Sequence, residues 1–261
     1  MKNSSMKDKK IIFISLLIIV GIWIFLSNKI NNSIYLPKIS EISREMLSIV
    51  KEKNFLLNIL NSLLRSVISF SIALAISIML GMLSGFNKFI YNFLYPINSI
   101  IKSIPTIAFI LIALIWLNKN YAAYLIGIVI SFPILYETTV NSIFNGNNDL
   151  NEMLESFKIS LLDKILNVHI QSIIINISSI ATSTFSLVLK VVIAGEVYGQ
   201  PTYGIGSAIQ GEKINFNTAG IFGWIIIVAI LCYISDKFIL YITHNFIKGR
   251  RYIWCDLTIL I

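Results

Sequence analysis

The chain has 261 residues, of which 56% are hydrophobic and only 13% are charged. This composition excludes an ordinary water-soluble domain and leaves room for about six membrane spans of ~20 residues each, with connectors. The formal net charge of +8 does not indicate nucleic-acid binding, because the lysines and arginines lie at the chain ends and in connectors. The sequence therefore predicts an all-α, polytopic membrane protein.

The N-terminal residues 1–10 carry four lysines and precede the apolar run 11–27. This order also fits a signal peptide, but no small-x-small cleavage site follows, because polar Asn28 and Lys29 come next. We therefore expect a cytoplasmic tail over 1–10 and a retained first span. A helical segment is expected next, over residues 40–53.

Five further apolar segments are long enough to cross a membrane as helices. The segment 93–117 contains Pro96 and Pro105, but a membrane helix tolerates proline when neighbouring groups satisfy the freed carbonyl, so one span is expected there. The expected membrane domain covers 11–247, followed by a tail over 248–261. Its six spans are 11–27, 60–86, 93–117, 121–144, 173–197 and 218–247.

Six spans place both termini on one side of the membrane, and the polar loop 145–171 shares that side. A modest excess of lysine and arginine there favours the cytoplasm. Asp149 with Glu152, and Ser160 with Asp163, have the form of capping boxes, so two short helices with a bend near Ser160 are expected. Their apolar stripe needs either a protein partner or a lipid surface.

Ionisable residues inside spans are functional candidates. Glu137, the only acid expected well inside a span, and Glu196 are both candidate residues of a translocation path. The alternative, favoured for Glu196, is a helix-end glutamate that reaches water. On the fifth span, a polar stripe shares one helix face and either lines a solute path or forms a tight helix–helix seam. Lys190 favours the path, because a dry seam would leave its ammonium unpaired unless an acid such as Glu137 reached it. A path lined by Lys190 would favour an anionic or strongly hydrogen-bonding solute. The stripe comprises Asn176, Ser179, Ser183, Ser186 and Lys190.

Enzyme motifs are absent from the sequence. It contains no G-x-x-x-x-G-K-[ST] phosphate loop and no serine paired with a base, so no catalytic residue and no cofactor are expected. The two cysteines, Cys232 and Cys255, have neither metal-ligand nor disulfide-framework spacing. Cys232 lies in an apolar run and is expected to be a small core residue.

Several short segments, in this order, resemble the permease subunits of binding-protein-dependent ABC importers, most closely those of the nitrate, sulfonate and taurine type. The resemblance runs from about residue 36 to residue 242. The segments are Leu36-Pro37-Lys38-Ile39-Ser40-Glu41, Ser62-Leu63-Leu64-Arg65-Ser66-Val67, Ser103-Ile104-Pro105, Ser131-Phe132-Pro133-Ile134-Leu135, and Ala194-Gly195-Glu196-Val197-Tyr198-Gly199 with Gly204-Ile205-Gly206.

The resemblance implies the type I ABC importer permease fold and a coupling role for the loop 145–171. Glu152 matches the family's glutamate, but Lys158 replaces its glycine and Gln171 its proline. In that family the loop inserts into a groove of the ATPase subunit. The implied partners are ATP-binding ABC subunits, an extracytoplasmic solute-binding protein and a second copy or similar permease, within the cytoplasmic membrane. The coupling residues would be Glu152, Leu154, Phe157, Lys158 and Ser160.

The main alternative is a self-contained secondary transporter driven by an ion gradient. An inverted repeat and several acids at mid-membrane would favour it. The sequence contains no evident repeat, and the alternative therefore ranks second.

Overall fold

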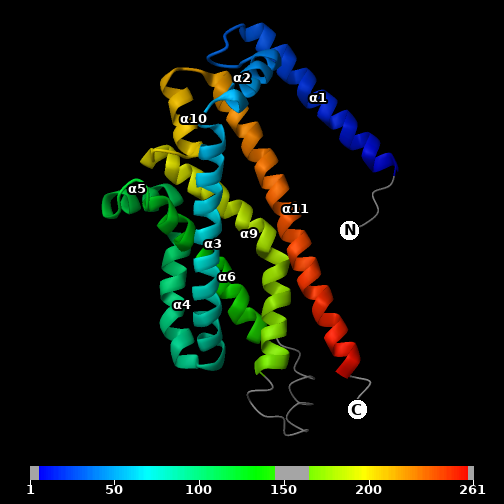
Figure 1. The fold of residues 1–261 in the computed structure, drawn as a ribbon, viewed down its shortest axis with the longest axis vertical. Coiled ribbons are helices and arrows are strands. Elements are labelled where there is room, and N and C mark those ends of the chain that lie inside the picture. The colour runs from blue at the N-terminus through cyan, green and yellow to red at the C-terminus, as the bar shows by residue number, and fades with distance from the viewer. Residues whose placement is uncertain (1–5, 145–164, 258–261) are drawn as a thin grey trace. The chain divides into compact units, whose positions relative to one another are not determined.

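The computed structural model describes residues 6–144 and 165–257, and all its regular elements in those ranges are helices (Figure 1). Within them, five helices are long and apolar enough to cross a membrane, and a bent pair makes a sixth when counted as one span. The prediction of an all-α polytopic protein is therefore confirmed. The elements are α1 (Met6–Ile30), α2 (Ile39–Lys51), α3 (Phe55–Phe86), α4 (Lys88–Ser103), α5 (Thr106–Trp116), α6 (Ala122–Phe144), a π-helical turn η1 (Ile165–His169), α9 (Ile170–Gly199), α10 (Ile205–Ile214) and α11 (Thr218–Leu257).

The chain divides into two compact units, Met1–Leu56 with Ala208–Ala229, and Leu57–Ser207 with Ile230–Ile261. In the first unit, the indole N–H of Trp23 on α1 donates to the Pro37 carbonyl at 3.1 Å. The Trp23 ring also meets the Phe222 ring edge-on, with centroids 5.1 Å apart. These contacts connect α1 to the start of α11.

In the second unit, α3 and α6 pack in parallel through small residues. The Ser69 hydroxyl donates to the Tyr124 carbonyl, and the Ser77 hydroxyl donates to the Phe132 carbonyl, both at 3.1 Å. Both pairs are 55 residues apart, so the two helices run in the same direction. Membrane helices approach closely where such residues recur on one face. The buried stripe on α3 is Ser62, Ser66, Ser69, Ala73, Ser77, Gly81 and Ser84.

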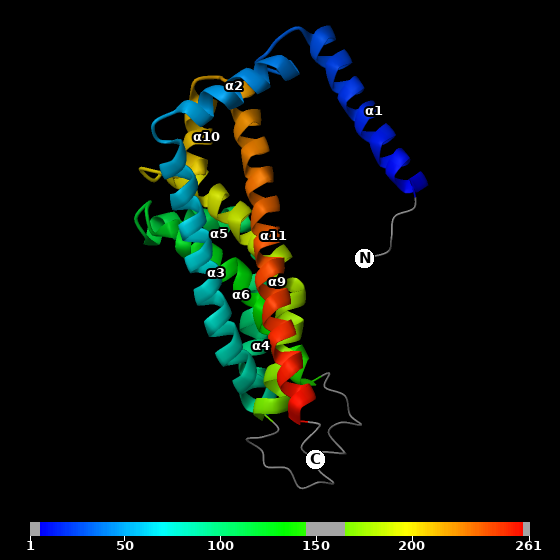
Figure 2. The same ribbon diagram turned by 45° about the vertical axis from the view of Figure 1, so that its right-hand side comes forward.

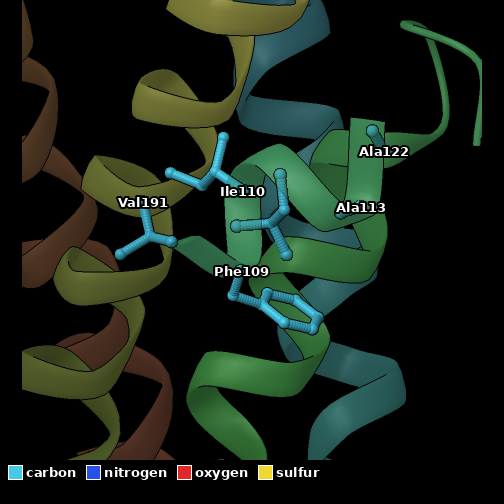
Figure 3. Close-up of a cluster of buried hydrophobic side chains, with 6 residues drawn as sticks. Phe109, Ile110, Ala113, Ala122 and Val191 are labelled. Carbon is cyan, nitrogen blue, oxygen red and sulfur yellow. The ribbon is translucent and has the colours of Figure 1, made fainter. Parts of the chain in front are cut away.

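α9 packs against α6 in the opposite direction. The Ser172 hydroxyl donates to the Ser142 carbonyl at 3.0 Å, near the start of α9 and the end of α6. Toward the other ends, Gly195 packs against α6, where an added Cβ would lie 2.8 Å from the end of the Ile126 side chain. A cluster of buried apolar residues joins α5, α6 and α9 (Figure 3), and it comprises Phe109, Ile110, Ala113, Ala122, Ile126 and Val191.

The expected continuous span over 93–117 is instead two helices, α4 and α5, bent by 101°. Pro105 cannot donate a backbone hydrogen bond, and it disfavours a helical conformation at the residue before it. Ile104 is accordingly extended, with φ −70° and ψ 126°. Pro96, by contrast, lies inside α4. The buried residues of α5 pack in the apolar cluster with α6 and α9, and this packing fixes the direction of α5 after the bend.

Candidate functional site

A buried ion pair connects α3 to the end of α9. Arg65 Nη1 lies 2.7 Å from Glu196 Oε1, and the two side chains are only 7% and 0% exposed. The Ser62 hydroxyl donates to Glu196 Oε2 at 2.7 Å, and the Gly206 N–H donates to the same oxygen at 3.0 Å. Arg65 Nη1 also donates to the Tyr203 carbonyl at 2.8 Å. The carboxylate therefore has three donors, which compensate for its removal from water.

The same contacts fix the turn between α9 and α10. Gln200 ends α9 in the left-handed conformation, with φ 48°. The first N–H groups of a helix have no partner within it, and at α10 they find partners on α3. The Gly204 N–H donates to Asn58 Oδ1 at 3.1 Å, and the Ile205 N–H donates to Ser62 Oγ at 2.8 Å. α3 therefore holds the beginning of α10.

The glycines of the Gly-Ile-Gly segment allow backbone and carboxylate to approach. A Cβ on Gly204 would lie 2.7 Å from the Glu196 carboxyl carbon. A Cβ on Gly206 would meet the Ile193 carbonyl oxygen and lie 2.6 Å from the Val197 backbone nitrogen. The segments 194–199 and 204–206, noted together in the sequence, are therefore in direct contact with each other.

The expectation that Glu196 reaches water from a helix end is wrong. Its side chain is fully buried, because Arg65 supplies a counter-ion 131 residues earlier in the chain. The available sequence signal was Arg65 itself, since an arginine inside an apolar run needs an acidic or carbonyl partner. This geometry gives Glu196 a structural role, and a role on a solute path gains no support from it.

Glu137 on α6 is bound by α4. Lys102 Nζ donates to both carboxylate oxygens of Glu137 at 2.8 Å, and the Asn98 amide donates to Oε1 at 2.8 Å. The two charged side chains are half-exposed, whereas Asn98 is buried. Lys102 precedes the bend between α4 and α5, so Glu137 braces the broken span and is not the counter-ion of Lys190.

The polar stripe on α9 lies largely on the exposed surface of the chain. Ser186 is half-buried, and the hydroxyls of Ser179 and Ser183 donate to carbonyls of their own helix, at 2.7 Å and 2.9 Å. Lys190 has no ion-pair partner among the described residues. The exposed members are Asn176, Ser179, Ser183 and Lys190.

An acid that the sequence analysis overlooked lies beside this stripe. Asp236 is within the apolar part of α11, so Glu137 is not the only acid inside a span. The Ser186 hydroxyl donates to Asp236 Oδ1 at 2.7 Å. Cys232, expected to be a core residue, is half-exposed one turn before Asp236. α9 and this part of α11 lie side by side in both views (Figures 1 and 2).

The predicted coupling residues lie outside the described residues, and so does the expected bend near Ser160. Within the described ranges, no group of three or more His, Cys, Asp or Glu side chains is arranged to hold a metal ion. The coupling residues concerned are Glu152, Leu154, Phe157, Lys158 and Ser160.

A family model described as "Binding-protein-dependent transport system inner membrane component" matches residues 73–248, about two thirds of the chain. The chain belongs to this family. It is a multi-pass membrane permease of an ABC importer system, which also includes an ABC ATPase and a solute-binding protein. No curated protein matches the chain. The family does not favour a self-contained secondary transporter.

The family match begins within α3 and ends within α11. It includes the loop 145–171, the α9 stripe and Asp236, whereas α1, α2 and Arg65 precede it. The permease's buried network therefore joins three residues before the matched region, Asn58, Ser62 and Arg65, to Glu196 and the Gly-Ile-Gly segment within it.

Proposed function

We propose that this permease forms a solute path together with a second copy of itself or a similar permease, and that ATP hydrolysis by separate subunits drives import through it. The observation that supports the path most directly is the exposed polar face of α9. Lys190 lies about 14 Å from the end of α9 at Gly199, at ~1.5 Å per residue, which is farther than a lysine side chain reaches. A charge in the middle of a span costs ~2.5–3.5 kcal/mol on insertion scales, so this face needs water or a polar partner.

Energy coupling is assigned to the cytoplasmic loop 145–171. An amphipathic helical loop between membrane spans needs a surface for its apolar face, and the ATPase of the importer supplies one. Closure of the ATPase pair would draw the loops of two permeases together and shift the spans between inward-open and outward-open states. This arrangement requires both termini, 1–10 and 248–261, to be cytoplasmic. The transported solute is a small molecule, and the nitrate, sulfonate and taurine class stays a prediction.

The energy source is tested by reconstitution. Purified alone, the permease should neither bind nor hydrolyse ATP, because its sequence lacks a phosphate loop. In proteoliposomes with its ATPase and solute-binding protein, uptake should require ATP and should persist after the ion gradient is collapsed. An ATPase variant without its phosphate-loop lysine is the control. Uptake by the permease alone, driven by a gradient, would overturn the proposal.

The coupling loop is tested with Glu152→Lys combined with Leu154→Asp. We expect the permease to fold and insert normally, while ATP hydrolysis is no longer stimulated by solute-loaded binding protein. Normal uptake by this variant would exclude the coupling role.

The path is tested with single cysteines at the α9 stripe, where a small water-soluble thiol reagent should react in at least one nucleotide state. If all three positions stay unreactive in every state, the stripe is a packing surface. The positions are Ser179, Ser183 and Ser186.

A further inference from the structure

Two residues of opposite charge, Lys190 on α9 and Asp236 on α11, lie near one contact between these helices. The Ser186 hydroxyl donates to Asp236 Oδ1 at 2.7 Å, which sets the register of the two helices. Lys190 follows Ser186 by one helical turn, and Cys232 precedes Asp236 by one turn. α11 runs in the opposite direction to α9 (Figure 1), so Lys190 and Cys232 lie on the same side of this contact. These four side chains form a single polar group, called here the α9–α11 cluster.

The two charges of the α9–α11 cluster do not neutralise each other directly. Among the described residues, neither Lys190 nor Asp236 takes part in an ion pair within 4.0 Å. Lys237 is no substitute partner for its neighbour, because adjacent residues of a helix do not face each other. Its ammonium lies instead over the Tyr233 ring, 5.5 Å from the centroid. The cluster therefore carries one cation and one anion with unused bonding capacity.

We propose that the α9–α11 cluster is a binding site for a small zwitterionic solute, whose anionic group lies at Lys190 and whose cationic group lies at Asp236. The inference rests on the proposed path and narrows its substrate class. A solute with a single charge would be attracted by one side chain and repelled by the other, and both effects are stronger away from bulk water. Lys190 and Ser186 are separated by ~6 Å along the helix axis, so one small solute can reach both charges. Asp236 thereby narrows the expectation, based on Lys190 alone, of an anionic or strongly hydrogen-bonding solute.

Cys232 makes the charge preference of the site measurable without knowledge of the natural substrate. With Cys255→Ser, Cys232 is the single thiol of the permease. The permease is reconstituted with its ATPase and binding protein and treated with three methanethiosulfonates, which carry a trimethylammonium, a sulfonate or a zwitterionic alanine group. Each labelling rate is divided by the reagent's rate with a free thiol in solution. This ratio cancels the intrinsic reactivity of each reagent.

We expect the zwitterionic reagent to label Cys232 at least about threefold faster than either singly charged reagent, because it alone matches both charges. Lys190→Gln should shift the preference to the cationic reagent, and Asp236→Asn should shift it to the anionic one. Lys237→Gln is the matched control, because it removes a charge at similar depth from another face of α11. Its reagent preference should equal that of the wild type.

Three other outcomes would contradict the solute path, the zwitterion site or the solute-binding role of the two charges. If Cys232 is not labelled in any nucleotide state, the proposed path itself fails at this position. If it is labelled but the preference is the same in Lys190→Gln and Asp236→Asn, the path stands and the zwitterion site is wrong. If either single substitution prevents assembly and the double substitution restores it, Lys190 and Asp236 form a structural pair and not a solute site.

Discussion

α9 carries two charged residues less than two turns apart, and their surroundings differ completely. Glu196 is fully buried and accepts hydrogen bonds from Arg65, Ser62 and the Gly206 backbone. Lys190 is exposed and has no ion-pair partner among the described residues. Six residues at ~100° each place the two side chains on different faces of the helix. A charge whose hydrogen bonds are all made within the chain stabilises the fold, whereas an unpaired charge on the same helix is available to a solute or a partner.

The contrast between Glu196 and Lys190 is tested most directly at the buried Arg65–Glu196 ion pair. Arg65→Ala leaves Glu196 charged and unpaired, which typically costs ~3–5 kcal/mol for a buried ion pair. We expect loss of folded permease after detergent extraction, measured by size-exclusion chromatography and thermal unfolding. Lys190→Gln is the control and should extract normally. Arg65→Met with Glu196→Met should recover part of the loss, because no unpaired charge remains.

A second prediction addresses the close approach of α10 to α9. Gly206→Ala places a Cβ 2.6 Å from the Val197 backbone nitrogen and in contact with the Ile193 carbonyl. Backbone atoms cannot yield, so we expect a cost at or above the ~1–3 kcal/mol typical of overpacking. The matched control is Gly211→Ala in the same helix, where the added Cβ would meet nothing within 4 Å. That change should stabilise the protein by up to ~1 kcal/mol. Equal thermal midpoints for the two variants would contradict the structural role of the buried network.

A third prediction concerns Lys190, the exposed charge of α9. Lys190→Leu should change the free energy of unfolding of the permease by no more than ~0.5 kcal/mol, because Lys190 has no ion-pair partner among the described residues. Uptake by the complete importer should fall nonetheless. Thermal unfolding in detergent and ATP-dependent uptake in proteoliposomes give the two readouts. A stability loss as large as that of Arg65→Ala would place Lys190 in a structural pair and remove the contrast with Glu196.

The local features of the chain could be predicted from the sequence, and the pairings between distant segments could not. Hydropathy locates membrane helices because an apolar run of ~20 residues is itself the physical requirement for spanning. The sequence shows a proline at position 105 but not the break between α4 and α5. Whether a helix continues through a proline depends on what the following segment packs against, which here is the apolar cluster that includes α5. Proline alone does not decide between a kink and a break.

The buried network was hidden from the sequence for a related reason. Glu196 and Arg65 are 131 residues apart, and no periodicity relates positions on separate helices. The small residues of the α3 stripe do recur at helical spacing, so the seam with α6 was available and was overlooked. Asp236 was equally visible as an acid within an apolar run. Its contact with Ser186 required the fold, because it depends on the register between α9 and α11.

The smallest expected effect concerns Glu212, a carboxylate that is partly buried and lies outside the membrane spans. Burial, followed by repulsion from Glu52 and Glu45, raises the pKa of Glu212 above its ordinary value of 4.5, although the Asn217 amide donates to it at 2.8 Å. The folded permease therefore binds this proton more tightly than the unfolded chain does. Its free energy of unfolding should fall as pH rises from about 4.5 through the folded pKa, and then stay level.

Glu212→Gln removes this dependence, so the variant should match the wild type near pH 4 and unfold at a slightly higher temperature at pH 7. Glu41→Gln is the control with opposite sign. The Lys38 N–H, and then the Ser33 hydroxyl, donate to Glu41 and lower its pKa, so its stabilisation is present at pH 7 and is lost in acid. Glu41→Gln should therefore be less stable than the wild type at pH 7. Thermal midpoints of the purified permease between pH 4 and pH 7 measure both differences. If Glu212→Gln lowers the midpoint at pH 7, the Asn217 hydrogen bond outweighs burial and Glu212 belongs with the fully compensated acids such as Glu196.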